Sequence, residues 1–182
     1  MRIIGGKYRG KKLFSPVSKN VRPTSDKARE ALFNILRNRM GADFSAYKMI
    51  DIFSGSGAFA LEALSQGFGK VALVDVDIKD LQRNVKLFEN EKQKIEVIKA
   101  DATNILLVND KFDVVFMDAP YNKGLTEKAL LSVSGILNNG ALCMVELEKN
   151  EVCEFPKCYN ILDERHYGIA KVIIAEFISQ SL

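Results

Sequence analysis

The chain has 182 residues, of which 47% are hydrophobic and 27% charged, proportions that fit a soluble globular domain rather than a disordered or fibrous chain. No apolar run is long enough to span a bilayer, and the N-terminus lacks the apolar segment of a secretory signal. Three cysteines without a C-x-x-C pair and a single histidine disfavour a disulfide framework and a zinc site. We therefore expect one cytoplasmic domain over residues 1–182, with no metal and no membrane partner.

The net charge of +3 conceals an uneven distribution along the chain. Residues 1–40 contain eleven Lys and Arg against two acids, a net charge of +9, and the rest of the chain carries a net charge of −6. A basic front on an acidic body indicates a polyanionic partner such as a nucleic acid. Charge alone fits a solvated N-terminus equally well.

At the front of the chain, two short segments flank a glycine-containing turn. Arg2–Ile4 and Lys11–Phe14 are expected to pair as a small basic hairpin. A helix is then predicted over Ser25–Arg39, with Thr24 or Ser25 as its N-cap. The apolar stripe of this helix comprises Ala28, Ala31, Leu32, Ile35 and Leu36.

From residue 48 onwards the pattern alternates strands rich in Val and Ile with amphipathic helices. The expected strands are Lys48–Phe53, Val71–Val76, Ile95–Lys99, Phe112–Met117 and Ala141–Leu147. The expected helices are Ala58–Gln66, Asp77–Glu89 and Leu125–Leu137. Repeated βα units form a parallel sheet with helices on its faces, because their crossovers are right-handed.

The tail of the chain has no room for a crossover helix between its last two strand patterns. Tyr159–Arg165 and Ile169–Ile178 are expected to form an antiparallel hairpin that closes the sheet, with its turn at His166–Gly168. The predicted fold class is therefore α/β and Rossmann-like, with a mostly parallel seven-stranded sheet over residues 24–182. The basic extension over residues 1–23 precedes it.

A glycine-rich turn follows the first strand of the predicted sheet. Gly55 and Gly57 let the backbone turn tightly and approach a ligand, and the helix that follows presents free amide donors at its start. Because Ala60 is compatible with a dinucleotide-binding fingerprint, the glycines leave a nicotinamide cofactor and an adenosyl cofactor both open. The cofactor-binding residues predicted in this turn are Asp51, Phe53, Ser54, Gly55, Ser56 and Gly57.

Further cofactor contacts are predicted at the ends of the next two strands. Asp75 is placed to accept hydrogen bonds from both ribose hydroxyls of an adenosine moiety, and Val76 to pack against the adenine. Asp101, followed by Ala102, is placed to accept a hydrogen bond from the adenine amino group. An alternative is that Asp75, Asp77 and Asp101 are helix N-caps, which the combination with the glycines disfavours.

The motif that indicates the chemistry follows the fourth strand and reads Asp118-Ala119-Pro120-Tyr121. An exocyclic amine of a base is a poor nucleophile, because its lone pair is delocalised into the ring. The Asp118 carboxylate and a backbone carbonyl at Asp118 or Ala119 would hold its hydrogens and favour a pyramidal nitrogen. Tyr121 would stack on the base, and Pro120 would stiffen the loop. The alternative is an ordinary turn containing proline.

The order DIFSGSG, DVD, DA and DAPY resembles that of class I, Rossmann-like amino-methyltransferases. The stretches RIIGGKYRGKKL, RPTSDKAREALFNIL and FSGSGAFALEALSQG, together with Tyr167–Lys171, resemble the bacterial 16S ribosomal RNA guanine-N2 methyltransferase family nearly end to end. This resemblance implies a monomeric enzyme that transfers a methyl group from S-adenosylmethionine to one guanine of small-subunit RNA. It also implies that Asp118 to Tyr121 contact the base. Ala119 stands where the family usually has a proline, which bears on rate and base preference.

The basic residues at the front are expected to face the RNA and to neutralise its phosphates, with an aromatic ring between them. The predicted RNA-binding residues are Arg2, Lys7, Tyr8, Arg9, Lys11, Lys12, Arg22, Thr24, Lys27 and Arg29. For Arg29 and Glu30, structural ion pairs are an equally good interpretation.

Three alternative functions stay open on the sequence. An amino-methyltransferase acting on adenine N6 or cytosine N4 of DNA or RNA fits the acceptor motif, although 182 residues leave no room for a large DNA-recognition domain. A nicotinamide oxidoreductase would leave the DAPY motif unexplained. A non-catalytic RNA-binding module would leave the glycine loop, Asp75 and Asp118 without a role.

Overall fold

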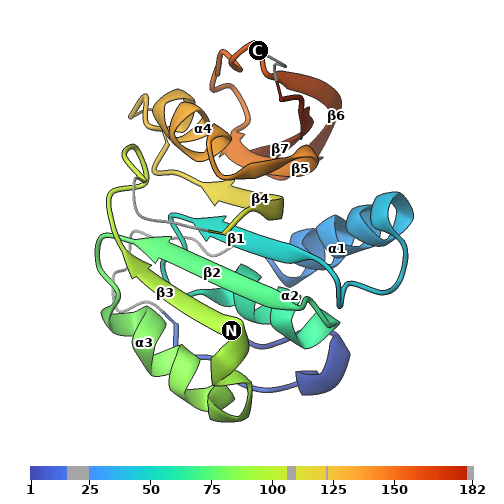
Figure 1. Cartoon of the computed structure of the whole chain (residues 1–182), viewed down its shortest axis with the longest axis vertical. Helices are drawn as coiled ribbons and strands as arrows, with labels where there is room; N and C mark the ends of the chain where they lie inside the picture. Colours follow the sequence, from blue (N-terminus) through green and yellow to red (C-terminus); the bar gives the residue numbers. More distant parts are fainter. Residues whose placement is uncertain (16–24, 106–109, 122, 180–182) are drawn as a thin grey trace.

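The computed structural model of the chain describes residues 1–15, 25–105, 110–121 and 123–179. Its centre is a seven-stranded sheet in the order β3-β2-β1-β4-β5-β7-β6 (Figure 1). The strands are β1 (Lys48–Ile52), β2 (Lys70–Asp75), β3 (Ile95–Lys99), β4 (Phe112–Asp118), β5 (Leu137–Glu148), β6 (Tyr159–Tyr167) and β7 (Ala170–Phe177). The first five run parallel, and β7 lies antiparallel to both β5 and β6. The predicted mostly parallel sheet and its terminal hairpin are confirmed.

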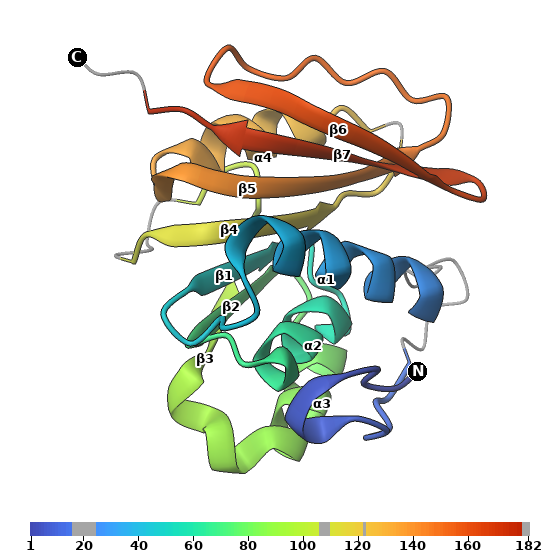
Figure 2. The same cartoon turned by 90° about the vertical axis from the view of Figure 1, so that its right-hand side faces the viewer.

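Helices cover both faces of the sheet. They are α1 (Asp26–Met40), α2 (Ala58–Gln66), α3 (Lys79–Val85) and α4 (Thr126–Ser134), with the 3₁₀ segments η1 (Gly6–Tyr8) and η2 (Lys86–Lys94). In Figure 2, α1, α2 and the N-terminal segment lie in front of the sheet and α4 lies behind it. The core divides in the same way: Leu36 and Leu61 belong to the apolar cluster under α1 and α2, and Leu130 belongs to the cluster under α4. None of the helices in the described part of the chain is long and apolar enough to cross a membrane.

Side chains along β4 alternate between these two layers. Val114 and Phe116 belong to the cluster under α1 and α2, whereas Val115 and Met117 belong to the cluster under α4. Asp118, the next residue and the last of the strand, therefore continues the α1/α2 side. The alternation thus places Asp118, the first residue of the DAPY motif, on the side of the sheet that α2 covers. The glycine turn leads directly into α2.

Helix α1 confirms one of the two predicted N-caps. Ser25 accepts a hydrogen bond from the backbone N–H of Ala28 at 3.1 Å, and Thr24 lies outside the described residues. Of the predicted stripe, Ala28, Leu32 and Leu36 are buried, while Ala31 and Ile35 are half-buried. The stripe also includes Phe33, which is fully buried and stacks on Phe59 of α2 at 5.0 Å between ring centroids.

The continuous helix predicted over Asp77–Glu89 is wrong. Helix α3 ends at Val85 and continues as η2, with non-helical backbone angles at Phe88 (φ −119°, ψ 34°). Phe88 is fully buried, and its ring meets that of Tyr8 edge-on at 5.1 Å. Packing against the N-terminal segment accompanies this kink, a contact that local periodicity cannot reveal.

The small N-terminal hairpin is present in a short form: Arg2 and Lys12 form an antiparallel bridge, and the Ile3 N–H donates to the Lys11 carbonyl at 2.9 Å and the Leu13 N–H to the Met1 carbonyl at 3.0 Å. Backbone groups between the two arms also bind α2: the Gly5 N–H donates to Glu62 Oε1 at 2.8 Å, and the Tyr8 N–H donates to Ser65 Oγ at 2.9 Å. Gly6 has φ +73°, and a Cβ there would lie only 1.8 Å from the carbonyl oxygen of Ser65. The segment is therefore shaped both by short antiparallel pairing and by close contact with α2. The predicted boundary between extension and core, at residues 23 and 24, lies outside the described residues.

Two further elements differ in length from their predictions. Helix α4 ends at Ser134 instead of continuing to Leu137, because Leu137 already pairs with Phe112 at the start of β5. The terminal hairpin turns at residues 168–169, with Gly168 at φ +64°.

Candidate active site

The glycine turn between β1 and α2 has a backbone that only small residues adopt easily. Gly55 and Gly57 have φ of +52° and +77°, and Phe53, a rare non-glycine case, has φ +62°. A Cβ at Gly57 would lie 2.5 Å from Leu81 Cδ1, so this glycine allows close packing. A Cβ at Gly55 would meet no heavy atom of the described residues within 4 Å, so the space beside this glycine is open.

Asp75, the last residue of β2, binds this turn through its carboxylate. Asp75 Oδ2 accepts a hydrogen bond from the Gly55 N–H at 2.7 Å, and its Oδ1 accepts one from the Asp77 N–H at 3.0 Å. Helix α3 begins at Lys79 with Ile78 at its N-cap, so Asp75 is not a helix cap. Val76 beside it is 64% exposed, which is unusual for an apolar side chain at the end of a buried strand. An acceptor carboxylate next to an uncovered apolar surface fits the ribose and adenine of an adenosyl group.

Ser54 and Ser56 complete the turn through buried polar contacts. The Ser54 N–H and hydroxyl both donate to the Val74 carbonyl, at 3.0 and 3.2 Å. The Ser56 carbonyl accepts a hydrogen bond from the buried side-chain amide of Asn84 at 2.9 Å. The conformation of the turn is thus fixed from β2 and α3 before any ligand binds.

After β3, Asp101 makes local contacts. Its Oδ1 accepts hydrogen bonds from the Thr103 N–H at 2.8 Å and the Thr103 hydroxyl at 2.7 Å, and these two bonds lower the pKa of its carboxyl. Asp101 is exposed, whereas the side chain of Ala102 is buried in the cluster under α4. Asp101 therefore lies at the protein surface just after β3. The buried side chain of Ala102 leaves only its backbone available for a contact at this surface.

Asp51 lies near the end of β1 and is 2% exposed. Its Oδ2 accepts a hydrogen bond from the Ala60 N–H of α2 at 3.2 Å. Burial raises the pKa of this carboxyl to about 8; the bond from Ala60 opposes the rise and the charge of Asp75 adds to it. Asp51 is thus a buried acid whose ionised form a nearby cation would favour.

The four residues of the DAPY motif lie in different environments. Asp118 is half-buried, Ala119 is buried, Pro120 is exposed and Tyr121 is half-buried. Burial, Glu146 and Asp51 raise the pKa of the Asp118 carboxyl well above its usual range. The motif therefore passes from the sheet to solvent within three residues. Its acid, Asp118, lies close to Glu146 and Asp51.

Glu146 of β5 is a component of this site that the sequence analysis did not identify. It is 5% exposed, pairs with Asp118 in the β4/β5 register, and accepts a hydrogen bond from the Tyr121 hydroxyl at 3.2 Å. Met144, two residues earlier, belongs to the cluster under α1 and α2, so Glu146 continues the same side as Asp118. A carboxylate at an inward position of the strand ALCMVELE was the signal that could have revealed it.

The structure divides the predicted RNA-facing residues into exposed and engaged groups. Arg2, Lys7, Arg9, Lys12 and Lys27 are exposed, and Tyr8 and Lys11 are half-buried. Arg22 and Thr24 lie outside the described residues.

Several of these side chains already have protein partners. Lys7 and the Tyr8 hydroxyl bind Glu91 Oε1, and Lys7, with Tyr8 and Lys94, lowers the pKa of Glu91 to about 2 against its burial. Lys11 Nζ donates to the Leu87 carbonyl at 2.6 Å. These contacts hold the N-terminal segment on η2, so Lys7 and Lys11 serve the fold as well as adding charge.

The side chain of Arg29 is buried and does not lie at the protein surface. It is 1% exposed, and its Nη2 donates to the Arg2 carbonyl at 2.8 Å and to Asp26 Oδ1 at 2.9 Å. Its Nε lies 3.8 Å from Glu62 Oε2. Of the two interpretations open on the sequence, the structural ion pair is the correct one, and the expectation that Arg29 faces RNA is corrected. A buried charge must be paired, and Glu62 supplies the charge from α2.

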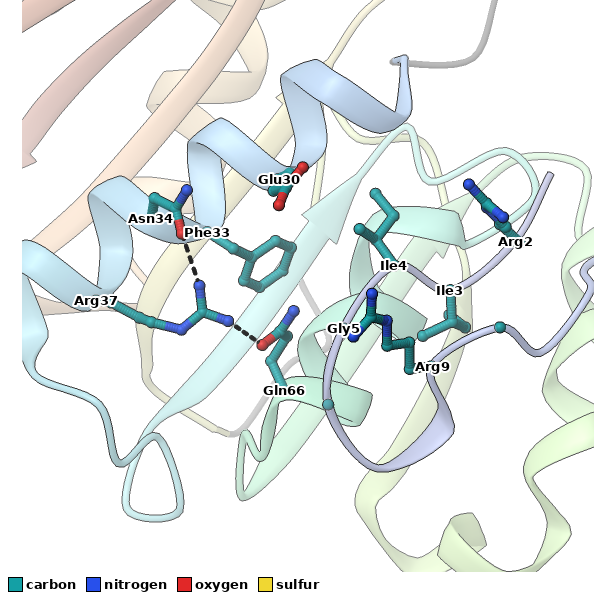
Figure 3. A pocket seen from close by; sticks show the side chains of 12 residues that line it. Arg2, Ile3, Ile4, Gly5, Arg9, Glu30, Phe33, Asn34, Arg37 and Gln66 are labelled. Carbon is teal, nitrogen blue, oxygen red and sulfur yellow. Dashed lines mark hydrogen bonds between the residues drawn. The ribbon is translucent and has the colours of Figure 1, made fainter.

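A cavity of about 580 Å³ lies between the N-terminal segment and α1 (Figure 3). Arg2 and Arg9 come from the segment, Glu30 and Arg37 from α1, and Gln66 from the last turn of α2. In Figure 3, Arg37 is held by Asn34 and Gln66. Because α2 begins at the glycine turn and ends at Gln66, this cavity lies at the other end of the helix from the DAPY motif.

The sheet order, the glycine turn and the strand-end acids define a Rossmann-like methyltransferase of class I. The family described as conserved hypothetical protein 95 matches residues 1–176, and the chain belongs to that family.

Curated relatives agree over most of the chain. The ribosomal RNA small subunit methyltransferase D of Haemophilus influenzae is 34% identical over 177 residues, covering 93% of this chain and 90% of its own length. The protein of the same name from Escherichia coli is 37% identical over 173 residues, covering 92% and 85%. A solved Escherichia coli structure, yhhF, assigned as a methyltransferase, is 29% identical, covers 99% of both chains and has a TM-score of 0.82. The predicted resemblance is confirmed.

Proposed function

We propose that the protein transfers a methyl group from S-adenosylmethionine to the exocyclic N2 of one guanine in the 16S ribosomal RNA of the small subunit. The observation that carries this proposal is the acid-x-Pro-aromatic turn at the end of β4, beside the glycine turn, in a chain whose relatives are named small-subunit ribosomal RNA methyltransferases. The name of the relatives supports the RNA substrate, and the chemistry of the motif supports an amine as the acceptor.

The cofactor supplies an electrophilic methyl group on a sulfonium. Asp75 would bind the ribose hydroxyls, Val76 the adenine face, and Asp101 with the Ala102 backbone the adenine edge. The open space beside Gly55, at the start of α2, would admit the rest of the cofactor. Asp51, near the end of β1, would contribute a carboxylate whose ionised form the positive charge of the cofactor favours.

The acceptor side of the reaction depends on positioning. The Asp118 carboxylate and the carbonyl of Asp118 or Ala119 would accept hydrogen bonds from the two N2 hydrogens and favour the pyramidal nitrogen as it attacks. Tyr121 would stack on the extruded base, and its hydroxyl is held by Glu146. Ala119, where the family usually has proline, keeps its carbonyl, and Pro120 still restricts its backbone.

RNA would approach across the exposed basic residues of the N-terminal segment and α1. The exposed residues proposed to bind its phosphates are Arg2, Arg9, Lys12 and Lys27. Arg22, which lies outside the described residues, is proposed to bind RNA as well. We further infer that residues 1–182 act as one monomeric domain in the cytoplasm, without a metal.

The experiment that tests this function is transfer of labelled methyl groups from S-adenosylmethionine to three pools: small-subunit particles, large-subunit particles and duplex DNA. Label that enters small-subunit RNA supports the proposal. Label in duplex DNA alone would replace it with a DNA amino-methyltransferase. Cofactor binding without label in any pool would favour a non-catalytic RNA-binding module.

A further inference from the structure

We propose that Glu146 selects guanine by accepting the N1–H of the target base, next to the amine that Asp118 holds. This inference rests on the proposed function and adds to it a residue that distinguishes guanine from other bases with an exocyclic amine.

The position of Glu146 is set by the sheet. It pairs with Asp118 across β4 and β5, on the side of the sheet that faces α1 and α2, and adjacent strands are about 4.8 Å apart. Beyond Asp118 the chain turns away through Pro120, which is exposed. Two carboxylates from neighbouring strands thus lie side by side where the acceptor motif begins.

The hydrogen bond from Tyr121 fixes Glu146 relative to the base. Because the Tyr121 hydroxyl donates to Glu146 Oε1 at 3.2 Å, the carboxylate lies at the rim of the tyrosine ring. A base stacked on the face of that ring, about 3.5 Å above it, would bring its own edge to the same rim. A carboxylate offers about four acceptor positions, so it can receive the Tyr121 hydroxyl and a second donor together.

The edge of guanine matches such a pair of acids. Guanine presents two neighbouring donors, the N2 amine and N1–H, whereas adenine presents its amine beside the bare N1 and cytosine its amine beside the bare N3. An ionised carboxylate only accepts hydrogen bonds, so it pairs with N1–H and repels a ring-nitrogen lone pair. The pair Asp118 and Glu146 is therefore complementary to guanine and opposed to the other two bases.

The test compares guanine with 2-aminopurine, which keeps the amine at C2 but lacks N1–H. After nucleoside analysis has located the modified position, small-subunit RNA is ligated from segments that carry either base there. The wild-type protein is expected to methylate guanine with a kcat/KM roughly 100-fold higher than 2-aminopurine. In Glu146→Gln, the amide N–H can donate to the bare N1, and the ratio is expected to fall at least tenfold.

Two controls separate base selection from mere support of Tyr121. Tyr121→Phe removes the hydroxyl that Glu146 holds; it is expected to slow both substrates alike and to leave their ratio unchanged. Glu154→Gln, at an exposed position, matches the chemical change elsewhere and is expected to leave the ratio unchanged. If Tyr121→Phe lowers the ratio as much as Glu146→Gln does, Glu146 only positions the ring and the inference is overturned.

The wild-type protein alone can overturn the inference even if Glu146→Gln fails to fold, and a guanine preference that persists in a folded Glu146→Gln overturns it as well. Efficient methylation of guanine with equal methylation of 2-aminopurine overturns base selection by Glu146 and leaves the proposed function standing. Failure to methylate guanine in small-subunit RNA overturns the proposed function and the inference together. A strong preference for guanine that collapses only in Glu146→Gln supports both.

Discussion

Asp75 at the end of β2 accepts a hydrogen bond from the backbone N–H of Gly55 at 2.7 Å, so one carboxylate ties the second strand to the turn that follows the first. A charged acceptor fixes a backbone donor more strongly than a neutral one does. The same oxygens are the ones proposed to receive the ribose hydroxyls, so one side chain shapes the cofactor site and binds within it.

Replacing Asp75 should therefore weaken cofactor binding more than a single lost contact would. Asp75→Ala is expected to reduce the affinity for S-adenosylhomocysteine at least tenfold, about 1.4 kcal/mol or more. Isothermal titration measures the change. Asp77→Ala, an exposed neighbour whose carboxylate only caps Lys79 at 3.2 Å, is the matched control. Equal losses in the two variants would contradict the role assigned to Asp75.

Alanine substitution of the two glycines of the turn should affect the stability of the fold and cofactor binding differently. Gly57→Ala places a Cβ 2.5 Å from Leu81 and 2.8 Å from Leu73 at φ +77°, and it is expected to destabilise the fold by roughly 2–4 kcal/mol. Gly55→Ala meets open space and should cost only the strain of its positive φ, roughly 1–2 kcal/mol, while obstructing the cofactor. Urea unfolding and cofactor titration of both variants separate these effects.

The buried Asp51 predicts a pH dependence of stability. Its pKa is about 8 in the folded protein and about 3.9 in an unfolded chain, so between these values the folded state holds a proton that the unfolded state has released. The free energy of unfolding should therefore fall as pH rises from about 4 to 8, and the loss is expected to be roughly 2–5 kcal/mol. Asp51→Asn should make this decline shallower in urea unfolding at pH 5, 6.5 and 8, and Asp118, whose pKa is also raised, should contribute the remainder. An identical decline in the variant would mean that other groups cause it.

Loss of Asp118 should affect methyl transfer and spare cofactor binding. Asp118→Ala removes a hydrogen-bond acceptor from the reacting amine, and the rate of methyl transfer is expected to fall by roughly 100-fold or more. Single-turnover transfer measures the rate, and titration with S-adenosylhomocysteine supplies the control. Unchanged turnover would remove the acceptor loop from the mechanism.

The RNA-facing surface should respond to charge reversal at exposed basic positions of the N-terminal segment. Arg9→Glu with Lys12→Glu is expected to weaken RNA binding and to reduce the slope of log affinity against log salt by roughly two. Lys157→Glu, exposed before β6, serves as the control. Lys7→Glu is unsuited to this test because Lys7 also holds Glu91. An unaltered slope in the double variant would place the RNA elsewhere.

The parts of the fold that sequence predicts well are those whose pattern is local. The boundaries of α2 and β3 follow directly from their periodicity and their flanking residues, and they agree with the structure residue for residue. The acids of the site were predictable where a motif contains them, as for Asp75 and Asp118. Each lies at the end of a parallel strand, where such folds bind ligands.

The features that sequence did not predict depend on contacts between distant segments. Phe88 departs from helical geometry where it packs against Tyr8, eighty residues earlier. Arg29 is buried with its Nε 3.8 Å from Glu62 Oε2 of another helix, which supplies an opposite charge. Glu146 belongs to the site only because β5 pairs with β4 in one particular register. No local pattern contains the contacts of Phe88 and Arg29, so these required the folded chain. Glu146 left a local sign, a carboxylate at an inward position of its strand, but its pairing with Asp118 also required the fold.

The central claim, guanine N2 as the methyl acceptor in small-subunit RNA, is tested most directly by the identity of the methylated nucleoside. Small-subunit RNA labelled by the wild-type protein is digested to nucleosides and separated against standards. The proposed chemistry predicts that the label is recovered as N2-methylguanosine, and that Asp118→Ala leaves this nucleoside unlabelled. Label in N6-methyladenosine or N4-methylcytidine would contradict the guanine assignment and the role of Glu146 together.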